Sequence, residues 1–256
     1  MQAALIVNRV GPEPSENLAR ILGMAERAAT AGAELILLPE AAVTGLVNND
    51  DPAHDLPLGE HIPGPATDAL GQLCSQRRVW LGFGLLERDG NQLYESAVLI
   101  GPNGRIALKY RRNQPQWHGR HASPDVYREG TELGSASTPF GRMAFLLCGD
   151  LFDDDIVSRF KDFGADWLLF PFARSFSDMS VDQRRWDTLE MPEYAGRVRQ
   201  GGAPALMVNY LADSTLQCDG SFGGAFVVSA AGEIIASRPL GREGILMVEL
   251  VSDAGS

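Results

Sequence analysis

The stretch RMAFLLCGDLFDDD, from Arg142 to Asp155, decides how the rest of the chain is interpreted. Its apolar run, Met143 to Leu147, predicts a short buried strand that ends at Cys148. The aspartates that follow predict a helix beginning near Asp153, because carboxylates favour the N-cap and first turn of a helix. In α/β folds, reactive side chains lie where the carboxyl end of a strand meets a helix N-terminus.

Two interpretations of Cys148 follow from this position. The backbone N–H groups of the coming helix carry partial positive charge, which favours a thiolate and therefore a nucleophile. The alternative is a buried structural cysteine, because free cysteine is among the most buried residue types. The local sequence leaves both open, and the rest of the chain favours the nucleophile.

The composition describes an acidic chain of one large α/β domain or two small ones. It has 256 residues, 45% of them apolar, and a net charge of −11, which argues against nucleic acid or an anionic membrane as a partner. No apolar run reaches the roughly 20 residues of a membrane span, and no signal-peptide pattern is present. Cys74, Cys148 and Cys218 are widely spaced and form no CxxC pair, which predicts a cytoplasmic protein without a disulfide framework or a zinc site.

The order of predicted elements indicates a mixed α/β fold. A strand over Ala3 to Val7, a helix capped by Ser15, and a strand over Glu34 to Leu38 form a βαβ unit with parallel strands. The turn Gly101 to Gly104 (GPNG) predicts an antiparallel hairpin. Further strands are expected over 79–86, 92–100, 105–110, 165–170, 203–210, 225–229, 233–237 and 245–250, and further helices over 66–77, 153–163 and 181–200, the last interrupted at Pro192. Polar stretches at 48–65 and 111–141 predict loops.

Two strand ends together resemble the nitrilase superfamily of carbon–nitrogen hydrolases. Leu37 to Gly45 (LLPEAAVTG) resembles its glutamate segment, and Phe145 to Phe152 (FLLCGDLF) resembles its nucleophile segment. Ala165 to Phe172 resembles the strand that follows, and the likeness spans nearly the whole chain. The resemblance implies a four-layer α-β-β-α sandwich with two mixed sheets, and a homodimer. The sequence has no low-complexity linker, charge block or short-period repeat, which predicts that residues 1–256 form a single domain.

The resemblance also implies the chemistry. Cys148 would attack an amide or nitrile carbon, and Glu40 would act as general base and then as general acid. A cation would stabilise the oxyanion. Arg112 stands where the family has a lysine, whereas Lys109 would point to the opposite face of a strand because the offset between them is odd. No metal and no organic cofactor is implied.

The family's second glutamate has no direct match. Ser123 stands at its place, and Asp125 or Glu129 could serve instead. His118 and His121 are interpreted as surface or pocket-edge residues. The candidate substrate-binding residues are Asp125, Trp117 and Phe172.

The sequence therefore predicts a cytoplasmic hydrolase that cleaves the C–N bond of a small amide through a cysteine thioester. Amides are favoured over nitriles because amidase branches are more numerous in the family. The alternative is a homologue that keeps the fold without turnover and binds a small amide or amine, or acts through its dimer surface.

Overall fold

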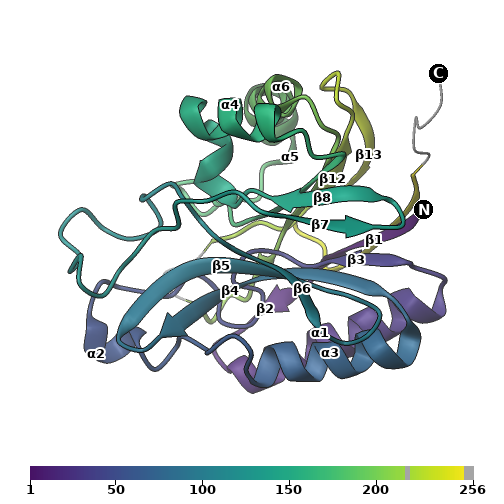
Figure 1. Ribbon diagram of the computed structural model, residues 1–256. Helices are drawn as coiled ribbons and strands as arrows, with labels where there is room; N and C mark the ends of the chain where they lie inside the picture. The colour runs from purple at the N-terminus through teal and green to yellow at the C-terminus, as the bar shows by residue number, and fades with distance from the viewer. Residues whose placement is uncertain (217–219, 251–256) are drawn as a thin grey trace.

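Two six-stranded sheets form the centre of the molecule (Figure 1). The structure, a computed structural model, describes residues 1–216 and 220–250, so Cys218 lies outside the described residues. The first sheet has the order β14 (Gly244–Glu249), β1 (Gln2–Val7), β3 (Leu35–Leu37), β4 (Trp80–Asp89), β5 (Gln92–Ile100), β6 (Ile106–Arg111). The second has the order β13 (Ile234–Arg238), β12 (Ala225–Val228), β10 (Ala205–Asn209), β9 (Trp167–Phe172), β8 (Gly141–Phe145), β7 (Ser135–Thr138).

Helices cover the outer side of each sheet. Helices α1 (Pro14–Thr30) and α3 (Pro65–Arg77) lie below the first sheet, and α4 (Asp154–Phe163) and α6 (Met191–Gly201) lie above the second (Figure 1). The four-layer α-β-β-α sandwich is thus confirmed. The remaining elements are β2 (Arg9–Val10), β11 (Leu211–Ala212), α2 (Pro52–Asp55), η1 (Cys148–Phe152), α5 (Gln183–Arg185) and η2 (Trp186–Glu190).

Both sheets are mixed, as expected. Strand β3 pairs in parallel with β1 and β4, and β9 pairs in parallel with β8 and β10, whereas the outer strands of each sheet pair antiparallel. The predicted βαβ unit and the predicted hairpin between β5 and β6 are both present. The carboxyl ends of β3 and β8 are therefore the places from which the Glu40 and Cys148 segments leave their sheets.

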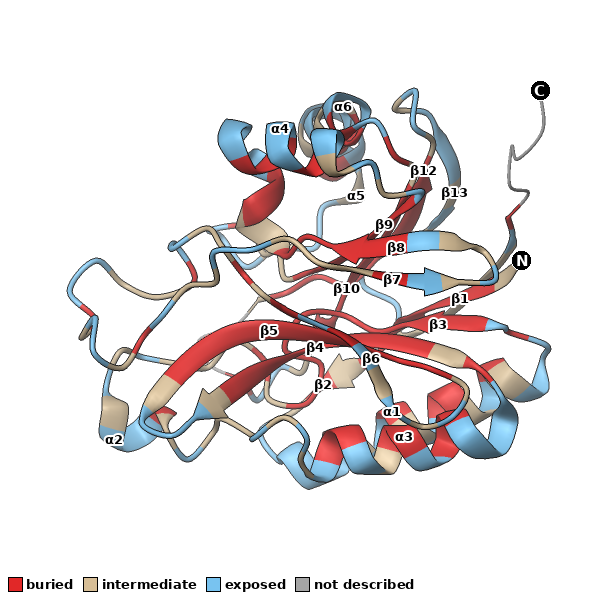
Figure 2. Ribbon diagram, viewed as in Figure 1, coloured by how far each residue is buried: buried red, intermediate tan, exposed pale blue. Residues whose placement is uncertain are grey.

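Alternation of side chains along the strands builds two core layers, and Figure 2 shows that the strands of both sheets are largely buried. In β3, Leu35 and Leu37 face the second sheet, while Ile36 packs with the helices α1 and α3. All three side chains are fully buried, and each contributes about 1.5–3 kcal/mol of hydrophobic free energy. Because both faces of β3 are covered, its sequence is continuously apolar rather than alternating.

Several local expectations were wrong. Helix α1 begins at Pro14 with Glu13 as its N-cap, so Ser15 does not cap it; proline suits the first helical position because it needs no N–H donor there. The loop predicted over 111–141 contains β7, whose polar sequence SAST gives no apolar pattern. The stretch 181–200 is divided into α5, the π-helical turn η2 and α6, with Pro192 in the first turn of α6.

Across the described part of the chain, the helices fall short of the length and apolar character that crossing a membrane requires.

Candidate active site

Glu40 lies in the turn that follows β3. Its backbone is pressed against β4, where a Cβ on Gly84 would lie only 2.6 Å from the Glu40 Cα. The N–H of Gly84 donates to the Pro39 carbonyl at 2.9 Å, and Ala41 has a positive φ of 46°. The absence of a side chain at Gly84 thus permits β4 to lie directly against the backbone of Glu40. This contact fixes the position of the Glu40 side chain, which is fully buried.

Cys148 lies where the chain leaves β8 and enters the short 3₁₀ turn η1. Its backbone has a positive φ of 44°, a conformation that non-glycine residues rarely adopt and that is found at functional sites. The thiol points toward the Ala173 carbonyl at 3.5 Å, and the residue is partly exposed. Helix α4 then begins as predicted, because the Asp153 carboxylate accepts hydrogen bonds from the N–H groups of Asp155 and Ile156.

Arg112 follows β6 and is almost completely buried, with 4% of its surface exposed. One terminal nitrogen, Nη1, lies 3.5 Å from Oε1 of Glu40, and the other, Nη2, donates to Gln114 at 2.7 Å. The guanidinium also lies against Gly149, where an added Cβ would come within 2.3 Å of Nη2. The cation is thus held between the Glu40 turn and the turn after Cys148.

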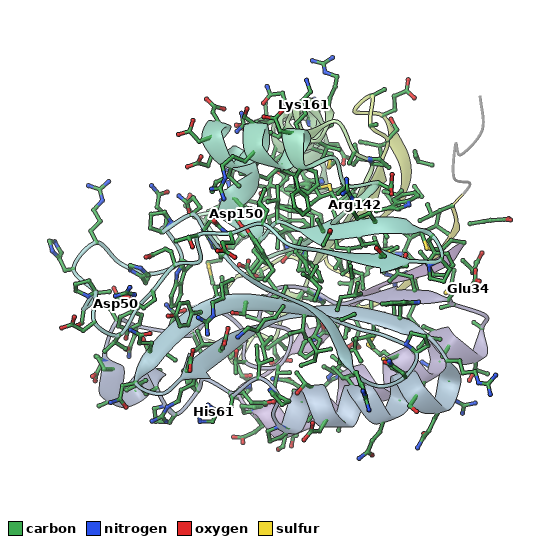
Figure 3. The ribbon with its side chains drawn as sticks, viewed as in Figure 1. Glu34, Asp50, His61, Arg142, Asp150 and Lys161 are labelled. Atoms are coloured by element: carbon green, nitrogen blue, oxygen red, sulfur yellow. The ribbon has the colours of Figure 1, made fainter. Side chains whose placement is uncertain are left out.

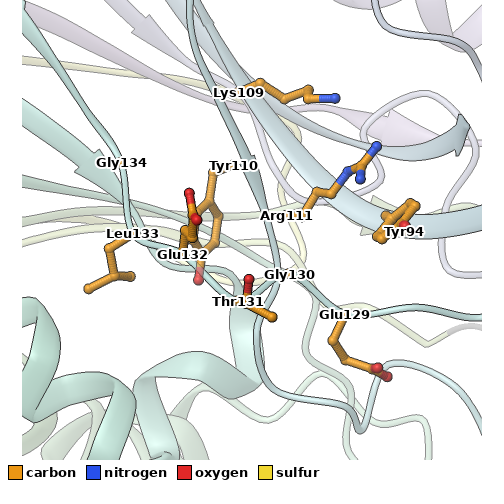
Figure 4. Close-up of a pocket in the computed structure, with 10 residues that line it drawn as sticks. All are labelled: Tyr94, Lys109, Tyr110, Arg111, Glu129, Gly130, Thr131, Glu132, Leu133 and Gly134. Carbon is orange, nitrogen blue, oxygen red and sulfur yellow. The ribbon is translucent and has the colours of Figure 1, made fainter.

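The fold brings these three predicted residues together from distant parts of the chain. The carboxyl of Glu40 neighbours both the Arg112 guanidinium and the Cys148 thiol. Lys109 lies elsewhere, because it donates to Glu87 on the outer face of the sheet. Figure 4 shows Lys109 and Arg111 on one side of β6 and Tyr110 on the other, and Arg112 belongs to the side of Tyr110.

Burial governs the protonation of the site. It raises the pKa of Glu40 to about 7, against the lowering effect of Arg112. Burial, together with the neighbouring Glu40, raises the pKa of the Cys148 thiol to about 12. The expectation that backbone N–H groups favour the thiolate is therefore wrong for the resting site, since desolvation outweighs them. A carboxyl with a pKa of about 7 beside the thiol can take up and release a proton near neutral pH.

Asp150 is a site residue whose role the sequence analysis did not recognise. Its carboxylate accepts four hydrogen bonds, from the Tyr110 hydroxyl and the backbone N–H groups of Asn113, Gln114 and Leu147. Figure 3 places it between the helices of one layer and the opposite sheet. The carboxylate ties the segment after Arg112 to the turn that carries Cys148. The signal in the sequence was a carboxylate two positions after the cysteine.

Glu95 was also missed. It lies on β5 with only 1% of its surface exposed, and burial raises its pKa well above the usual range, to which Glu40 adds. The signal was a single glutamate within the apolar strand sequence LYESAVLI. A glutamate is rarely fully buried in a strand, and buried ionisable groups cluster at functional sites.

The candidate substrate-binding residues have diverse surroundings. Asp125 is exposed on its loop. Trp117 is buried and packs its ring against those of His118 and Tyr127. Phe172 is fully buried and stacks on Phe170 and Trp186. It immediately precedes Ala173, whose carbonyl faces the thiol. Their roles in binding remain predictions.

The candidates for the second glutamate lie on the loop between β6 and β7. Oε1 of Glu129 is hydrogen-bonded to the ring Nε2 of His118 at 2.8 Å, and Glu129 lines a surface cavity of about 300 Å³ (Figure 4). The backbone carbonyl of Ser123 accepts the N–H groups of Val126 and Tyr127. Within residues 1–216 and 220–250, no group of three His, Cys, Asp or Glu side chains is arranged to hold a metal ion.

Comparison with known proteins identifies the family. The model of the carbon–nitrogen hydrolase family matches residues 2–256. The omega-amidase NIT2 of Xenopus tropicalis is 24% identical over 193 residues, which cover 73% of this chain and 67% of the relative. An aliphatic nitrilase of Sinorhizobium fredii is 25% identical over 276 residues, which cover 99% of this chain and 85% of the relative.

A solved structure of an amidase from Nesterenkonia AN1, described as a member of the nitrilase superfamily, shares the fold. It superposes with a TM-score of 0.79 at 23% sequence identity and covers 99% of this chain and 91% of its own. The resemblance inferred from the glutamate and cysteine segments is thus confirmed. The chain belongs to the carbon–nitrogen hydrolase family of the nitrilase superfamily.

Proposed function

We propose that this protein hydrolyses a small amide at its C–N bond, with Cys148 as nucleophile, Glu40 as general base and acid, and Arg112 as the cation that stabilises the oxyanion. The observation that carries the proposal is the meeting of these three side chains, with a Glu40 pKa of about 7. A carboxyl with such a pKa takes and returns protons efficiently near neutral pH.

The first half of the reaction forms a thioester. Glu40 takes the thiol proton of Cys148, and the sulfur attacks the carbonyl carbon, so that a C–S bond forms and the carbonyl electron pair moves onto oxygen. As this tetrahedral intermediate collapses, the C–N bond breaks and the nitrogen takes the proton from Glu40. Ammonia or an amine leaves, and the acyl group stays on the sulfur.

The second half regenerates the enzyme. Glu40 takes a proton from water, whose oxygen attacks the thioester carbon, and the C–S bond then breaks. The proton returns from Glu40 to the sulfur of Cys148, and the carboxylic acid leaves. In both halves the Arg112 guanidinium is charged at every working pH, so it offers fixed positive charge where the oxyanion develops.

A labelling experiment tests the nucleophile. Iodoacetamide is expected to alkylate Cys148 faster than Cys74, which is fully buried, and faster than Cys218; peptide mass spectrometry identifies the site. Glu40→Gln is expected to slow this alkylation, because glutamine cannot take the thiol proton. Equal labelling of the three cysteines would favour a binding protein without turnover and would contradict the proposal.

A turnover experiment tests the reaction and identifies the substrate. Intact-mass spectrometry after rapid mixing with a panel of small amides is expected to find an acyl adduct on Cys148, and ammonia release is expected to follow it. In a related case, a glutamate-to-glutamine mutant of the Nesterenkonia amidase undergoes Michael addition of acrylamide at its active-site cysteine. An absence of both adduct and ammonia for every amide would overturn the hydrolase function.

The setting of the enzyme is part of the proposal. We expect residues 1–256 to act as one domain in the cytoplasm, and we expect a homodimer, which the resemblance implies. The free state of Cys74 and Cys148 supports a reducing compartment. Light scattering coupled to size-exclusion chromatography measures the oligomeric state directly, and a monomer at micromolar concentration would contradict the dimer.

A further inference from the structure

A second buried carboxyl, that of Glu95, lies beside the site described above. The Glu95 carbonyl on β5 accepts the backbone N–H of Arg112 at 2.8 Å, and the neighbouring pair is Ser96 with Arg111. Glu95 and Arg112 therefore stand opposite each other, with their side chains on the same face of the sheet. This is the face on which Ala97 packs in the core between the two sheets.

The carboxyl of Glu95 acts electrostatically on the site. Both Glu40 and Arg112 are close enough to shift its protonation, in opposite directions. Neither of its oxygens has a hydrogen-bond partner among the residues that the structure describes. Within the same described set, Oε2 of Glu40 and Nε of Arg112 also lack partners. Three acceptor atoms and one donor are thus buried together and unsatisfied.

The outer face of the same sheet demonstrates that a buried carboxyl can be fully satisfied here. Glu87, which is 2% exposed, accepts hydrogen bonds from Ser96, Lys109 and Arg111. Leaving a buried polar group unpaired is costly, so the unpaired atoms of Glu95 and its neighbours form a set that a ligand can complete.

We propose that Glu95 binds the nitrogen of the substrate amide, so that the site selects unsubstituted carboxamides over N-alkylated ones. An unsubstituted carboxamide carries one acceptor oxygen and two N–H donors. The oxygen matches the Arg112 guanidinium, and the two N–H donors match the free oxygens of Glu40 and Glu95. An N-methyl amide offers only one N–H and would place a methyl group against a buried carboxyl. The inference rests on the proposed function, and Glu95 is its specificity-determining residue.

The same contact suits the departing nitrogen. When the C–N bond breaks, the nitrogen takes the proton held by Glu40 and becomes ammonia, which has three N–H bonds. Glu95 accepts one or two of them, and this contact persists until ammonia leaves. Burial, together with the neighbouring Glu40, raises the pKa of Glu95 well above its usual range. A neutral Glu95 still accepts an N–H through its carbonyl oxygen.

The test uses alkylation of Cys148, which needs recognition of the amide but no turnover. Iodoacetamide and N-methyl iodoacetamide transfer their acetamide carbon to the sulfur, iodide leaves, and Glu40 takes the thiol proton. Each rate is divided by the rate of the same reagent with glutathione. Wild-type protein is expected to prefer iodoacetamide by about 10- to 100-fold, as expected for one hydrogen bond to a carboxyl.

Two substitutions separate the hydrogen bond from the charge. Glu95→Leu removes both acceptor oxygens at similar volume, and it is expected to reduce the preference for iodoacetamide to less than about threefold. The variant is expected to stay folded, because the substitution also removes an unpaired buried polar group. Glu95→Gln keeps one carbonyl acceptor and is expected to keep most of the preference. Glu87→Gln, on the opposite face of the sheet, is the matched control and is expected to keep the wild-type preference.

The outcomes distinguish this inference from the proposed function. A wild-type protein without preference, or a folded Glu95→Leu variant that keeps the full preference, overturns the role of Glu95 even if small amides are hydrolysed. If Glu95→Leu does not fold, Glu95→Ala replaces it, and the ratio of kcat/KM for an unsubstituted amide to kcat/KM for its N-methyl analogue is measured. A ratio that falls toward one in this variant supports the acceptor role of Glu95, and a ratio that stays near the wild-type value contradicts it. Preference in alkylation without any ammonia release supports Glu95 and contradicts only the hydrolase function.

Discussion

The hydroxyl of Tyr110 donates to the carboxylate of Asp150 at 2.7 Å and so joins the strand before Arg112 to the turn after Cys148. The same carboxylate accepts the N–H groups of Gln114 and Leu147, one from each side of the site. Arg112 and Cys148 are therefore positioned relative to each other by a third residue, Asp150, which belongs to neither sheet.

Asp150→Asn is expected to lower both stability and activity. An amide in place of the carboxylate directs an NH₂ group at a backbone N–H donor, because both oxygens of Asp150 accept from backbone groups. A buried donor left unpaired costs about 1–3 kcal/mol. Urea denaturation measures the loss, and kcat/KM for the identified amide measures the displacement of Arg112.

Asp155→Asn provides the control for Asp150→Asn. Asp155 is exposed in the first turn of α4, so its neutralisation is expected to change the free energy of unfolding by less than about 0.5 kcal/mol. An equal loss in both variants would mean that Asp150 contributes only negative charge.

Gly149→Ala is expected to lower kcat by about 100-fold with a small effect on stability, because a misplacement of about 1 Å at a reacting group has this cost. The new methyl group would lie 2.3 Å from Nη2 of Arg112 and 2.5 Å from Oε1 of Gln114, so the guanidinium must move. Steady-state kinetics measures kcat. Gly196→Ala is the control, since its added Cβ would meet nothing within 4 Å apart from its chain neighbours and the nearby backbone of its own helix. An equal fall in kcat there would contradict the steric explanation.

The sequence predicted the fold better than the site. Apolar strands and the turns between them are local patterns, so the βαβ unit and the hairpin could be predicted from the chain alone.

Glu40 and Cys148 were found because each follows an apolar strand. Glu95 was not found, because its position beside Glu40 and Arg112 depends on packing between distant segments, although a lone glutamate in an apolar strand was visible in the sequence. Three of the four partners of Asp150 lie 36 to 40 residues away in the chain, and no local pattern reveals contacts of that kind. The raised pKa of Cys148 depends on burial that only the folded structure defines.

Arg112→Met is expected to lower kcat/KM by about 10²–10³-fold, since it removes the fixed charge that stabilises the oxyanion. Arg112→Lys keeps the charge and is expected to keep more activity, although it loses the second nitrogen that binds Gln114. Steady-state kinetics compares the two. Lys109→Met is the control because Lys109 binds Glu87 on the outer face; if this variant lost activity and Arg112→Met did not, the assignment of the cation would be wrong.

Glu40→Gln is expected to abolish turnover and yet to stabilise the protein above neutral pH. Burial raises the pKa of Glu40 from its ordinary value of 4.5 to about 7, so the folded protein binds this proton more tightly than the unfolded chain does. The stabilisation from the proton is complete below pH 4.5 and is lost as the pH rises through about 7, where an anionic Glu40 faces Asp150 and Glu95 as well as Arg112. Glutamine stays neutral throughout.

The free energy of unfolding of the Glu40→Gln variant should therefore match that of the wild type near pH 4 and exceed it by about 2–3 kcal/mol at pH 8. Urea denaturation at both pH values measures the difference. In the wild type, kcat/KM should rise with pH through about 7 as the base ionises. A stability difference that is the same at pH 4 and pH 8 would show that Glu40 does not change its protonation in the folded protein, and the role of Glu40 as a base tuned by burial would then be untenable.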